Sequence, residues 1–208
     1  MDVVAEKDLR RFDELIEGLD HALTLQEVGT PPGLPATNQP LLLPSNNPQT
    51  AYERIVDVAS AVMRSDYASV QMLYPGRGAG GELRLLAFRG FNPHAAKFWE
   101  WVRADSKSTC GLALSSTRRV VAPDIAGCEF MANSEDRQVY LQTGIHACQT
   151  TPLISRTGNV VGMISTHWRT PHQPAENDLR AFDVLARQAA DLIEQARDLN
   201  PPDEYTVF

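Results

Sequence analysis

The sequence predicts an α+β fold in which a mostly antiparallel sheet carries helices on its faces. Segments such as DYASVQMLY at 66–74 and LRLLAFR at 83–89 alternate as strands do. Short turn sequences between such segments are typical of hairpins, whose strands pair antiparallel. Other segments space their apolar residues by three and four positions, as helices do. The elements follow the order helix, two strands, helical stretch, three strands, helix.

Two pieces precede the predicted domain. Residues 1–28 predict an amphipathic helix, because apolar side chains recur there with heptad spacing between charged faces. These side chains are Leu9, Phe12, Ile16, Leu19 and Leu23. The helix either packs on its own domain or forms a dimer seam. Residues 29–50 hold six of the 14 prolines and predict a semi-extended linker, since proline fixes φ and lacks an N–H donor.

The domain itself is predicted over residues 51–199. It opens with a helix that has one apolar face, made by Ile55, Val58, Ala59 and Val62. The glycine-rich segment PGRGAGGE at 75–82 lacks the Lys-Ser/Thr pair of a phosphate-binding loop and precedes a strand, so it predicts a hairpin tip. The middle of the domain is predicted to contain helices near 93–102, from about 110 and over 134–143, with a short strand at 119–122.

A strand pair and a long helix are predicted to complete the domain. HACQTTPLI at 146–154 and NVVGMISTHW at 159–168 alternate like strands around the turn SRTG. Residues 174–199 then space their apolar side chains by three and four, and the prolines at 201 and 202 end this helix. Residues 200–208 are predicted to be a tail.

Charge and composition disfavour several classes of partner. The formal net charge is -7, and no cluster of Lys and Arg offers a surface for nucleic acid or for anionic membranes. No apolar run approaches the roughly 20 residues that cross a bilayer, and the charged N-terminus lacks the apolar core of a signal peptide. We therefore expect a cytoplasmic protein. Its three cysteines, Cys110, Cys128 and Cys148, are expected to be free thiols.

The stretch from Ala51 to about Arg197 resembles GAF domains, in particular those of bacterial sensor histidine kinases. The resemblance rests on the order and spacing of DYASVQM at 66–72, LRLLAFRGF at 83–91, FWEWVRADSKSTCGLAL at 98–114, TTPLISRTGNVVGMISTHW at 150–168 and the PHQP turn before the last helix. It implies a central antiparallel sheet of about six strands. One face would carry the first and last helices, and the other would enclose a small-molecule pocket beneath helices and loops.

The resemblance also implies a signalling role and, often, a homodimer in which terminal helices pair. Neither a phospho-acceptor helix nor an ATP-binding module follows the GAF-like segment in this sequence. Output is therefore expected to pass through oligomeric state or through a partner, such as a histidine kinase or another signalling protein.

Cys110 is the thiol with the most distinctive surroundings, because Ser106 or Ser108 could cap a helix that begins beside it. A thiol in the first turn of a helix has its pKa lowered by the backbone dipole, which would suit redox sensing or covalent attachment of a ligand. The alternative is a small buried side chain that packs beneath the pocket.

The strand at 146–154 offers two sets of candidates. His146 and Cys148 are predicted to share one face, where they would line a pocket or bind a metal ion, and Gln149 and Thr151 to lie on the other. A closed zinc site would need further ligands to converge on the pair. The sequence offers Cys110, His94 and His167 for that role. Pocket or core lining is the interpretation that needs no such convergence.

Four further residues are candidates for ligand contact. His167 ends a predicted strand without a G-x-S-x-G elbow nearby, so a hydrogen-bonded structural role is the default. Trp99 and Trp101 lie two apart in a predicted helix, so one is expected to pack inward while the other meets the pocket or a partner. Aromatic rings suit a planar ligand such as a nucleotide base or a tetrapyrrole. Asp124 is a candidate either for capping a turn at the pocket rim or for contacting a ligand.

These residues favour a sensory module that binds a small molecule. They form no complete catalytic constellation, and they do not identify a cofactor. Three alternatives remain open. The first is a thiol-dependent enzyme similar to free methionine sulfoxide reductases, although the three cysteines do not align with that pattern. The second is a chromophore-binding domain, although Gly111 follows Cys110 where bilin sites commonly have histidine. The third is an interaction module whose pocket is empty.

Overall fold

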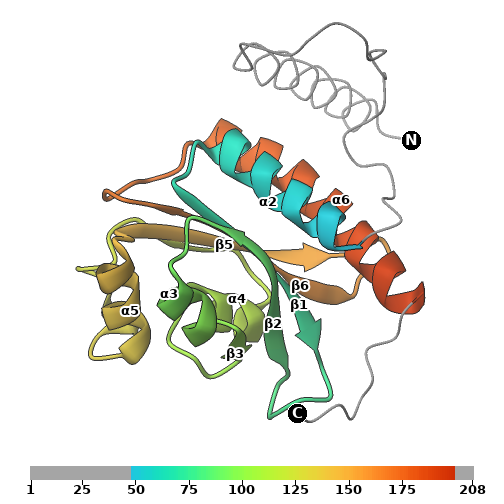
Figure 1. Cartoon of the computed structure of the whole chain (residues 1–208), viewed down its shortest axis with the longest axis horizontal. Coiled ribbons are helices and arrows are strands. Elements are labelled where there is room, and N and C mark those ends of the chain that lie inside the picture. Colours follow the sequence, from blue (N-terminus) through green and yellow to red (C-terminus); the bar gives the residue numbers. More distant parts are fainter. Residues whose placement is uncertain (1–47, 200–208) are drawn as a thin grey trace, which may run out of the picture. The chain divides into compact units, whose positions relative to one another are not determined.

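Six antiparallel strands form one sheet in the order β3-β2-β1-β6-β5-β4, which is the centre of the computed structural model (Figure 1). The structure describes residues 48–199. The helix predicted at 1–28, the linker up to residue 47 and the tail at 200–208 lie outside that range. The strands are β1 Tyr67–Tyr74, β2 Glu82–Arg89, β3 Trp101–Arg103, β4 Val120–Ala122, β5 Ala147–Ile154 and β6 Val160–Trp168. The predicted α+β class is confirmed.

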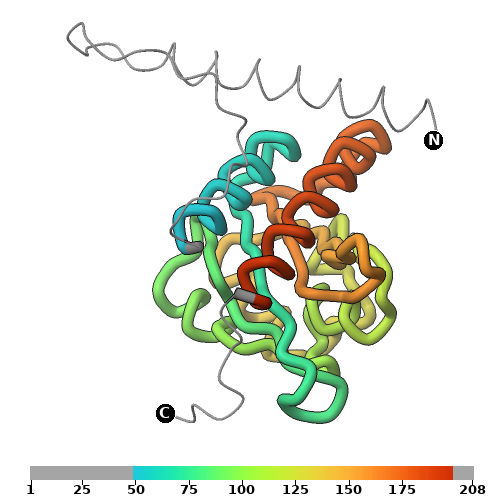
Figure 2. Tube along the Cα trace, turned by 90° about the vertical axis from the view of Figure 1, so that its right-hand side faces the viewer, coloured from blue at the N-terminus to red at the C-terminus, as the bar shows by residue number. Residues whose placement is uncertain are grey.

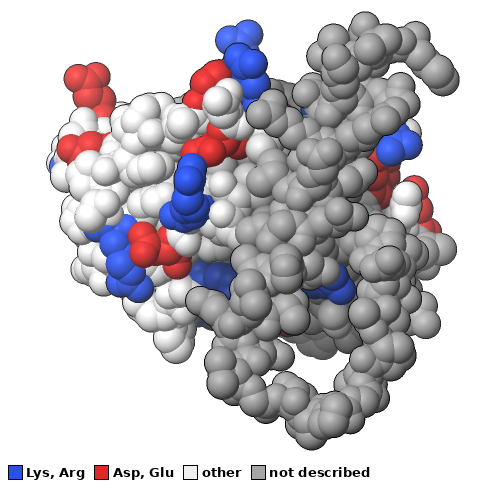
Figure 3. All heavy atoms as spheres, turned by 90° about the horizontal axis from the view of Figure 1, so that it is seen from above, with Lys and Arg blue, Asp and Glu red and all other residues white. Residues whose placement is uncertain are grey.

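Two long helices cover one face of this sheet. They are α2, Pro48–Met63, and α6, Glu176–Leu199, which lie side by side across the strands (Figures 1 and 2). Their inner stripes are fully buried, among them Val56 and Phe182. α2 begins three residues before the predicted start, because proline suits the first position of a helix, where no N–H partner is needed. Lys and Arg are interspersed with Asp and Glu on the described part of the surface seen in Figure 3.

Short helices cover the other face. They are α3 Pro93–Phe98, α4 Thr109–Ser116, the 3-10 turn η1 Glu129–Met131 and α5 Glu135–Thr143. Each α-helix begins at a side-chain cap that accepts a backbone N–H, and these caps are Asn92, Ser108 and Ser134. This arrangement of long helices on one face and short helices on the other confirms what the resemblance implied.

The predicted helix over 93–102 is wrong in its second half. α3 ends at Phe98, and Trp101–Arg103 forms strand β3 on the edge of β2. The backbone groups of β2 outweigh local helix preference here, since they offer β3 a ladder of hydrogen bonds and its Val102 a buried position. The strand patterns in the sequence predicted five strands. With β3 the sheet has six, as the resemblance implied.

Close packing between β1 and β6 requires glycine at position 162. A Cβ atom built there would lie 2.0 Å from the backbone oxygen of Gln71, a contact that no side-chain rotation relieves. Gly162 pairs with Met72 in the centre of the sheet, so neither strand is free to move away. Gly76, in the tip of the hairpin between β1 and β2, has room for a side chain, because no atom lies within 4 Å of a Cβ atom built there.

We expect Gly162→Ala to lower the free energy of unfolding by about 2–3 kcal/mol, as overpacking of a rigid interior does. Chemical denaturation of the full chain measures this difference. The control Gly76→Ala should stay within about 0.5 kcal/mol of the wild type, as surface changes generally do. Equal stability of the two variants would mean that β1 and β6 do not approach as closely as the structure shows.

Candidate functional site

Buried polar side chains gather on the sheet face beneath α4. Three of them are register partners in β1, β6 and β5, where Ser69 and Thr150 both lie opposite Ser165. Directly paired residues point to the same face, so the sheet register itself collects them. We call the set the polar cluster. It comprises Ser69, Gln71, Thr109, Cys110, Tyr140, Cys148, Thr150, Ser165 and His167, each 6% exposed or less.

Hydrogen bonds run through this polar cluster from β6 to α4. The hydroxyls of Ser165 and Thr150 lie 2.8 Å apart, and the Thr150 hydroxyl donates to that of Thr109 at 2.8 Å. The Thr109 hydroxyl in turn lies 3.0 Å from the Cys148 thiol and 3.3 Å from the Tyr140 hydroxyl. The first residue of α4 is therefore anchored to the sheet by polar rather than apolar contacts.

The two thiols of the polar cluster are not activated. Burial raises the pKa of Cys110, and it raises the pKa of Cys148 to about 12. Ser108 is the cap of α4, and the Cys110 thiol lies 3.4 Å from the Ser165 hydroxyl. Loss of solvation thus outweighs the helix dipole at Cys110, so the geometry fits the alternative of a buried, unreactive thiol.

Two polar atoms of the cluster have no hydrogen-bond partner among the described residues. They are Oε1 of Gln71 and Nδ1 of His167. Burial lowers the pKa of His167 to about 3, and a hydrogen bond to the Tyr67 backbone opposes that shift. The imidazole is therefore neutral, so one of its ring nitrogens carries a proton and the other is an acceptor. The default structural role of His167 thus accounts for one ring nitrogen only.

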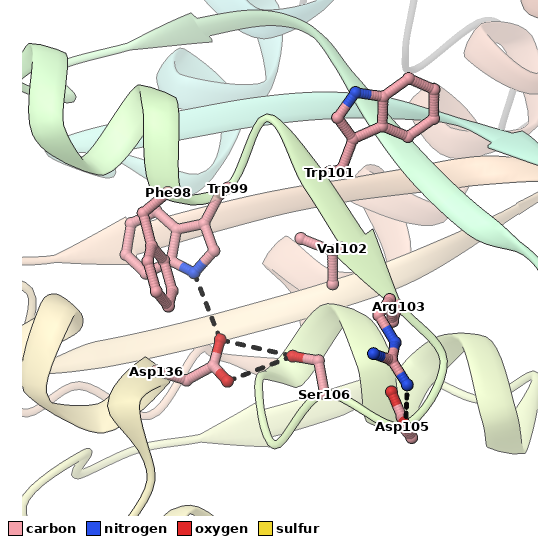
Figure 4. A pocket seen from close by; sticks show the side chains of 8 residues that line it. All are labelled: Phe98, Trp99, Trp101, Val102, Arg103, Asp105, Ser106 and Asp136. Atoms are coloured by element: carbon pink, nitrogen blue, oxygen red, sulfur yellow. Dashed lines mark hydrogen bonds and ion pairs between the residues drawn. The ribbon is translucent and has the colours of Figure 1, made fainter. Parts of the chain in front are cut away.

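An open cleft of about 320 Å³ lies next to the polar cluster (Figure 4). Its lining residues are Phe98, Trp99, Trp101, Val102, Arg103, Asp105, Ser106 and Asp136. The Asp136 carboxylate points into it and accepts hydrogen bonds from Trp99 Nε1 at 3.4 Å and from the Ser106 hydroxyl at 3.2 Å. Burial raises the pKa of Asp136, and these two donors oppose that effect.

Trp99 separates the cleft from the polar cluster. Its ring packs on the Tyr140 ring at 4.5 Å, and its carbonyl accepts a hydrogen bond from the Gln71 amide at 3.4 Å. Trp101 also lines the cleft, but its half-exposed ring points away from Asp136 and packs 4.0 Å from the Arg77 guanidinium (Figure 4). Trp99 is buried and Trp101 half-exposed, and Trp101 lies on a strand and not on the predicted helix.

Four other candidates lie outside the cleft and the polar cluster. Asp124 is exposed and accepts a hydrogen bond from the Ala126 N–H at 3.0 Å. Of its two predicted roles, this contact fits the capping of a turn. Gln149 and Thr151 bond to each other on the face that α6 covers. His146 was expected to share a face with Cys148, but β5 begins only at the next residue and His146 is half-buried. Within 48–199 no three His, Cys, Asp or Glu side chains are placed to share a metal ion.

Sequence reasoning missed Asp136, Ser106 and Gln71. Asp136 and Ser106 lie 30 residues apart in the sequence, so no local pattern joins them. By itself, Asp136 resembles an ordinary acidic residue in the first turn of a helix. Gln71 carried one usable signal, because strand alternation places its side chain on the same side of the sheet as that of Ser69, so two polar side chains share this face of β1. The described part of the chain also contains no helix with the length and apolar character that a bilayer requires.

His167 predicts an acid-sensitive fold. Its pKa is about 3 in the folded chain and 6.5 when unperturbed, so between these values the unfolded chain binds a proton that the folded chain does not. Above about pH 6.5, His167 therefore does not lower the free energy of unfolding. As pH falls from 6.5 toward 3, protonation of this group in the unfolded chain lowers the free energy of unfolding by about 1.4 kcal/mol per pH unit. We expect His167→Gln to flatten this dependence in urea unfolding measured from pH 7 to pH 4. The exposed His94→Gln should keep the wild-type slope, and a wild-type slope in His167→Gln would contradict the assignment.

Comparison with protein-family models matches residues 47–193 to the GAF domain. No curated protein matches the sequence. Among solved structures, a domain described as part of a two-component sensor histidine kinase from Sinorhizobium meliloti 1021 is 21% identical, with a TM-score of 0.59 over 74% of this chain and 97% of that chain.

Two other solved structures show the same fold. The GAF domain of an Acinetobacter phosphoenolpyruvate-protein phosphotransferase is 15% identical, with a TM-score of 0.63 over 97% of this chain and 100% of that chain. The free methionine-R-sulfoxide reductase of Neisseria meningitidis, in complex with its substrate, is 16% identical, with a TM-score of 0.56 over 74% of this chain and 83% of that chain. The family model covers more than half of the sequence, and with the shared six-stranded fold it establishes that this chain belongs to the GAF domain family.

Proposed function

We propose that this GAF domain is a regulatory module that binds a small molecule in the cleft beside Trp99 and passes the signal to α6. The observation that carries the proposal is the open cleft, which Trp99 separates from a polar cluster with two unpartnered buried atoms. Each such atom costs about 1–3 kcal/mol relative to a satisfied one. A purely structural core would be more stable with apolar side chains there, so the arrangement fits a site that a ligand completes.

The turn between β5 and β6 provides a connection from the sheet to α6. Three side chains of this turn, those of Ser155, Thr157 and Asn159, donate to one carboxylate oxygen of Glu194 at 2.9, 2.8 and 3.3 Å. These bonds lower the pKa of Glu194, so its charged form holds the turn. The two strands that meet at this turn carry Thr150 and Ser165 of the polar cluster.

A second connection joins the middle of β5 to α6. The guanidinium of Arg119, which precedes β4, donates to the Thr151 hydroxyl at 2.9 Å and also to the Asp183 carboxylate. α6 is therefore attached at Thr151 of β5 and at the turn that follows β5. A ligand that shifts these strands has two polar routes to the helix, and a difference in binding free energy between two positions of α6 is what regulation requires.

The output proposed for α6 is protein contact, either in a homodimer of paired terminal helices or with a histidine kinase or another signalling protein. The sensor histidine kinase and phosphotransferase contexts of similar domains support such a role. A cytoplasmic location is part of the proposal, and the three free thiols suit a reducing compartment. Clustered basic residues would be needed for nucleic acid or membrane surfaces, so we propose neither as a partner.

We further propose that the domain acts without catalysing a reaction. In the Neisseria reductase a similar fold holds the substrate of that enzyme, so this fold is compatible with catalysis in that protein. Thiol chemistry needs an accessible thiolate, whereas burial raises the pKa of Cys110 and Cys148. Cys128 is only partly buried, but it lies outside the polar cluster.

Native mass spectrometry and thermal unfolding of the full chain, against a panel of metabolites and nucleotides, test the binding step. At least one compound should raise stability, by about 2.7 kcal/mol when its concentration is a hundred times its dissociation constant. Hydrogen exchange then tests the coupling, because the bound compound should change the protection of α6 amides. A protein that no compound in the panel stabilises, and that carries none from its host, would count against a sensory role.

The variant Glu194→Ala separates coupling from binding. It should bind the same compound while α6 responds less, because the turn at residues 155–159 loses its shared acceptor. Glu176→Ala is the matched control, since Glu176 pairs only within α6, with Arg180 at 3.4 Å. An α6 response in Glu194→Ala as large as in the wild type would show that the turn is not the route.

Thiol reactivity tests the proposal that catalysis is absent. With DTNB, Cys128 should react in the native protein, while Cys110 and Cys148 should react only on unfolding. The variant Cys128→Ser should lose the native reaction and keep both protected thiols. Rapid native labelling of Cys110 or Cys148, located by mass spectrometry, would instead favour a thiol-dependent enzyme.

A further inference from the structure

Asp136, in the first turn of α5, gives the cleft beside Trp99 a negative charge that no described cationic side chain pairs with. Its carboxylate is partly buried and contacts only neutral donors, Trp99 and Ser106. Among residues 48–199 no Lys, Arg or His forms an ion pair with Asp136. The guanidinium of Arg103 also lines the cleft, but it donates to Asp105 at 2.6 Å, so these two charges cancel.

Aromatic rings form the wall beside this carboxylate. Phe98 and Trp99 stand edge to face, with ring centroids 5.8 Å apart, and both side chains point toward Asp136 (Figure 4). The Trp99 indole directs its N–H edge, and not its face, at Asp136. A cation in the cleft would therefore gain from the carboxylate, and the rings would provide an apolar wall for the rest of the ligand.

Two buried polar atoms without a partner, Gln71 Oε1 and His167 Nδ1, lie behind Trp99 and do not line the cleft. The rings of Phe91 and Tyr140 pack against both His167 and Trp99. The Gln71 amide is bonded to the Trp99 carbonyl. Among the described residues that line the cleft, Asp136 carries the charge that no ion pair neutralises, so the cleft favours a cation over an anion.

We infer that the cleft takes a compact organic cation with N–H donors, of the alkylammonium or arylammonium class, whose positive group pairs with Asp136 beside the Trp99 indole. The inference rests on the proposed small-molecule function and adds the chemical class of the ligand. The volume of about 320 Å³ lies at the lower end of ligand pockets, which restricts the ligand to a small molecule of few rings.

Three probes of nearly equal shape and different charge test this class: benzylammonium, benzyl alcohol and benzoate. Each is titrated into the full chain while the indole N–H resonance of Trp99, assigned with Trp99→Phe, is followed by NMR. Benzylammonium should shift this resonance and bind at least about tenfold more tightly than either other probe, a difference of about 1.4 kcal/mol. Binding of benzoate or benzyl alcohol as tight as that of benzylammonium, or no binding of benzylammonium, overturns the inference.

Variants locate the charge responsible. Asp136→Asn keeps the shape of the side chain and should reduce benzylammonium binding to the level of benzyl alcohol, while Asp136→Glu should retain the preference. Asp105→Asn is the matched control, because Asp105 lines the same cleft but is paired with Arg103. An unchanged preference in Asp136→Asn would refute the assignment. Binding without charge preference would refute only the ligand class, whereas failure of every compound and probe to bind would also refute the proposed function.

Discussion

The pairing of β5 with β6 determines what lies on each face of the sheet. Cys148 opposite His167, and Thr150 beside them, point toward α4 because directly paired residues share a face. The next residue, Thr151, points the other way and meets Arg119 beneath α6. A slip of one residue would exchange the two sets. One register thus builds the polar cluster and attaches the sheet to the long helix.

This arrangement works against stability where the polar cluster is buried. The hydroxyl chain through Thr109 and Thr150 satisfies most of its members, but Gln71 and His167 each keep an atom without a partner. A partly satisfied network is less stable than an apolar core of the same shape. The polar cluster therefore lowers the stability of the fold relative to an apolar core, which is the cost that a proposed ligand site would carry.

Local signals made most of the fold predictable. β1 was predicted at 66–74 and occupies Tyr67–Tyr74, since alternation and a glycine-rich turn are encoded in adjacent residues. β3 was missed because its first residues were assigned to the helix predicted over 93–102, and they become a strand only where β2 offers its edge. The candidate site was likewise predictable only in part. Cys110 and His167 were chosen for their chemistry, whereas Asp136 matters because distant segments remove it from water, which no local pattern records.

Trp99 lies between the cleft and the polar cluster and contacts both. The indole N–H donates to Asp136 on the cleft side, while its ring lies on Tyr140 on the cluster side. In the proposed function, a ligand that competes for Asp136 would remove the polar restraint on the ring. The proposed route to α6 then runs through the Gln71 amide to β1, which pairs with β6, whose turn with β5 is held by Glu194. This contiguous series of hydrogen bonds and packed rings is the physical basis of the coupling that we propose between the cleft and α6.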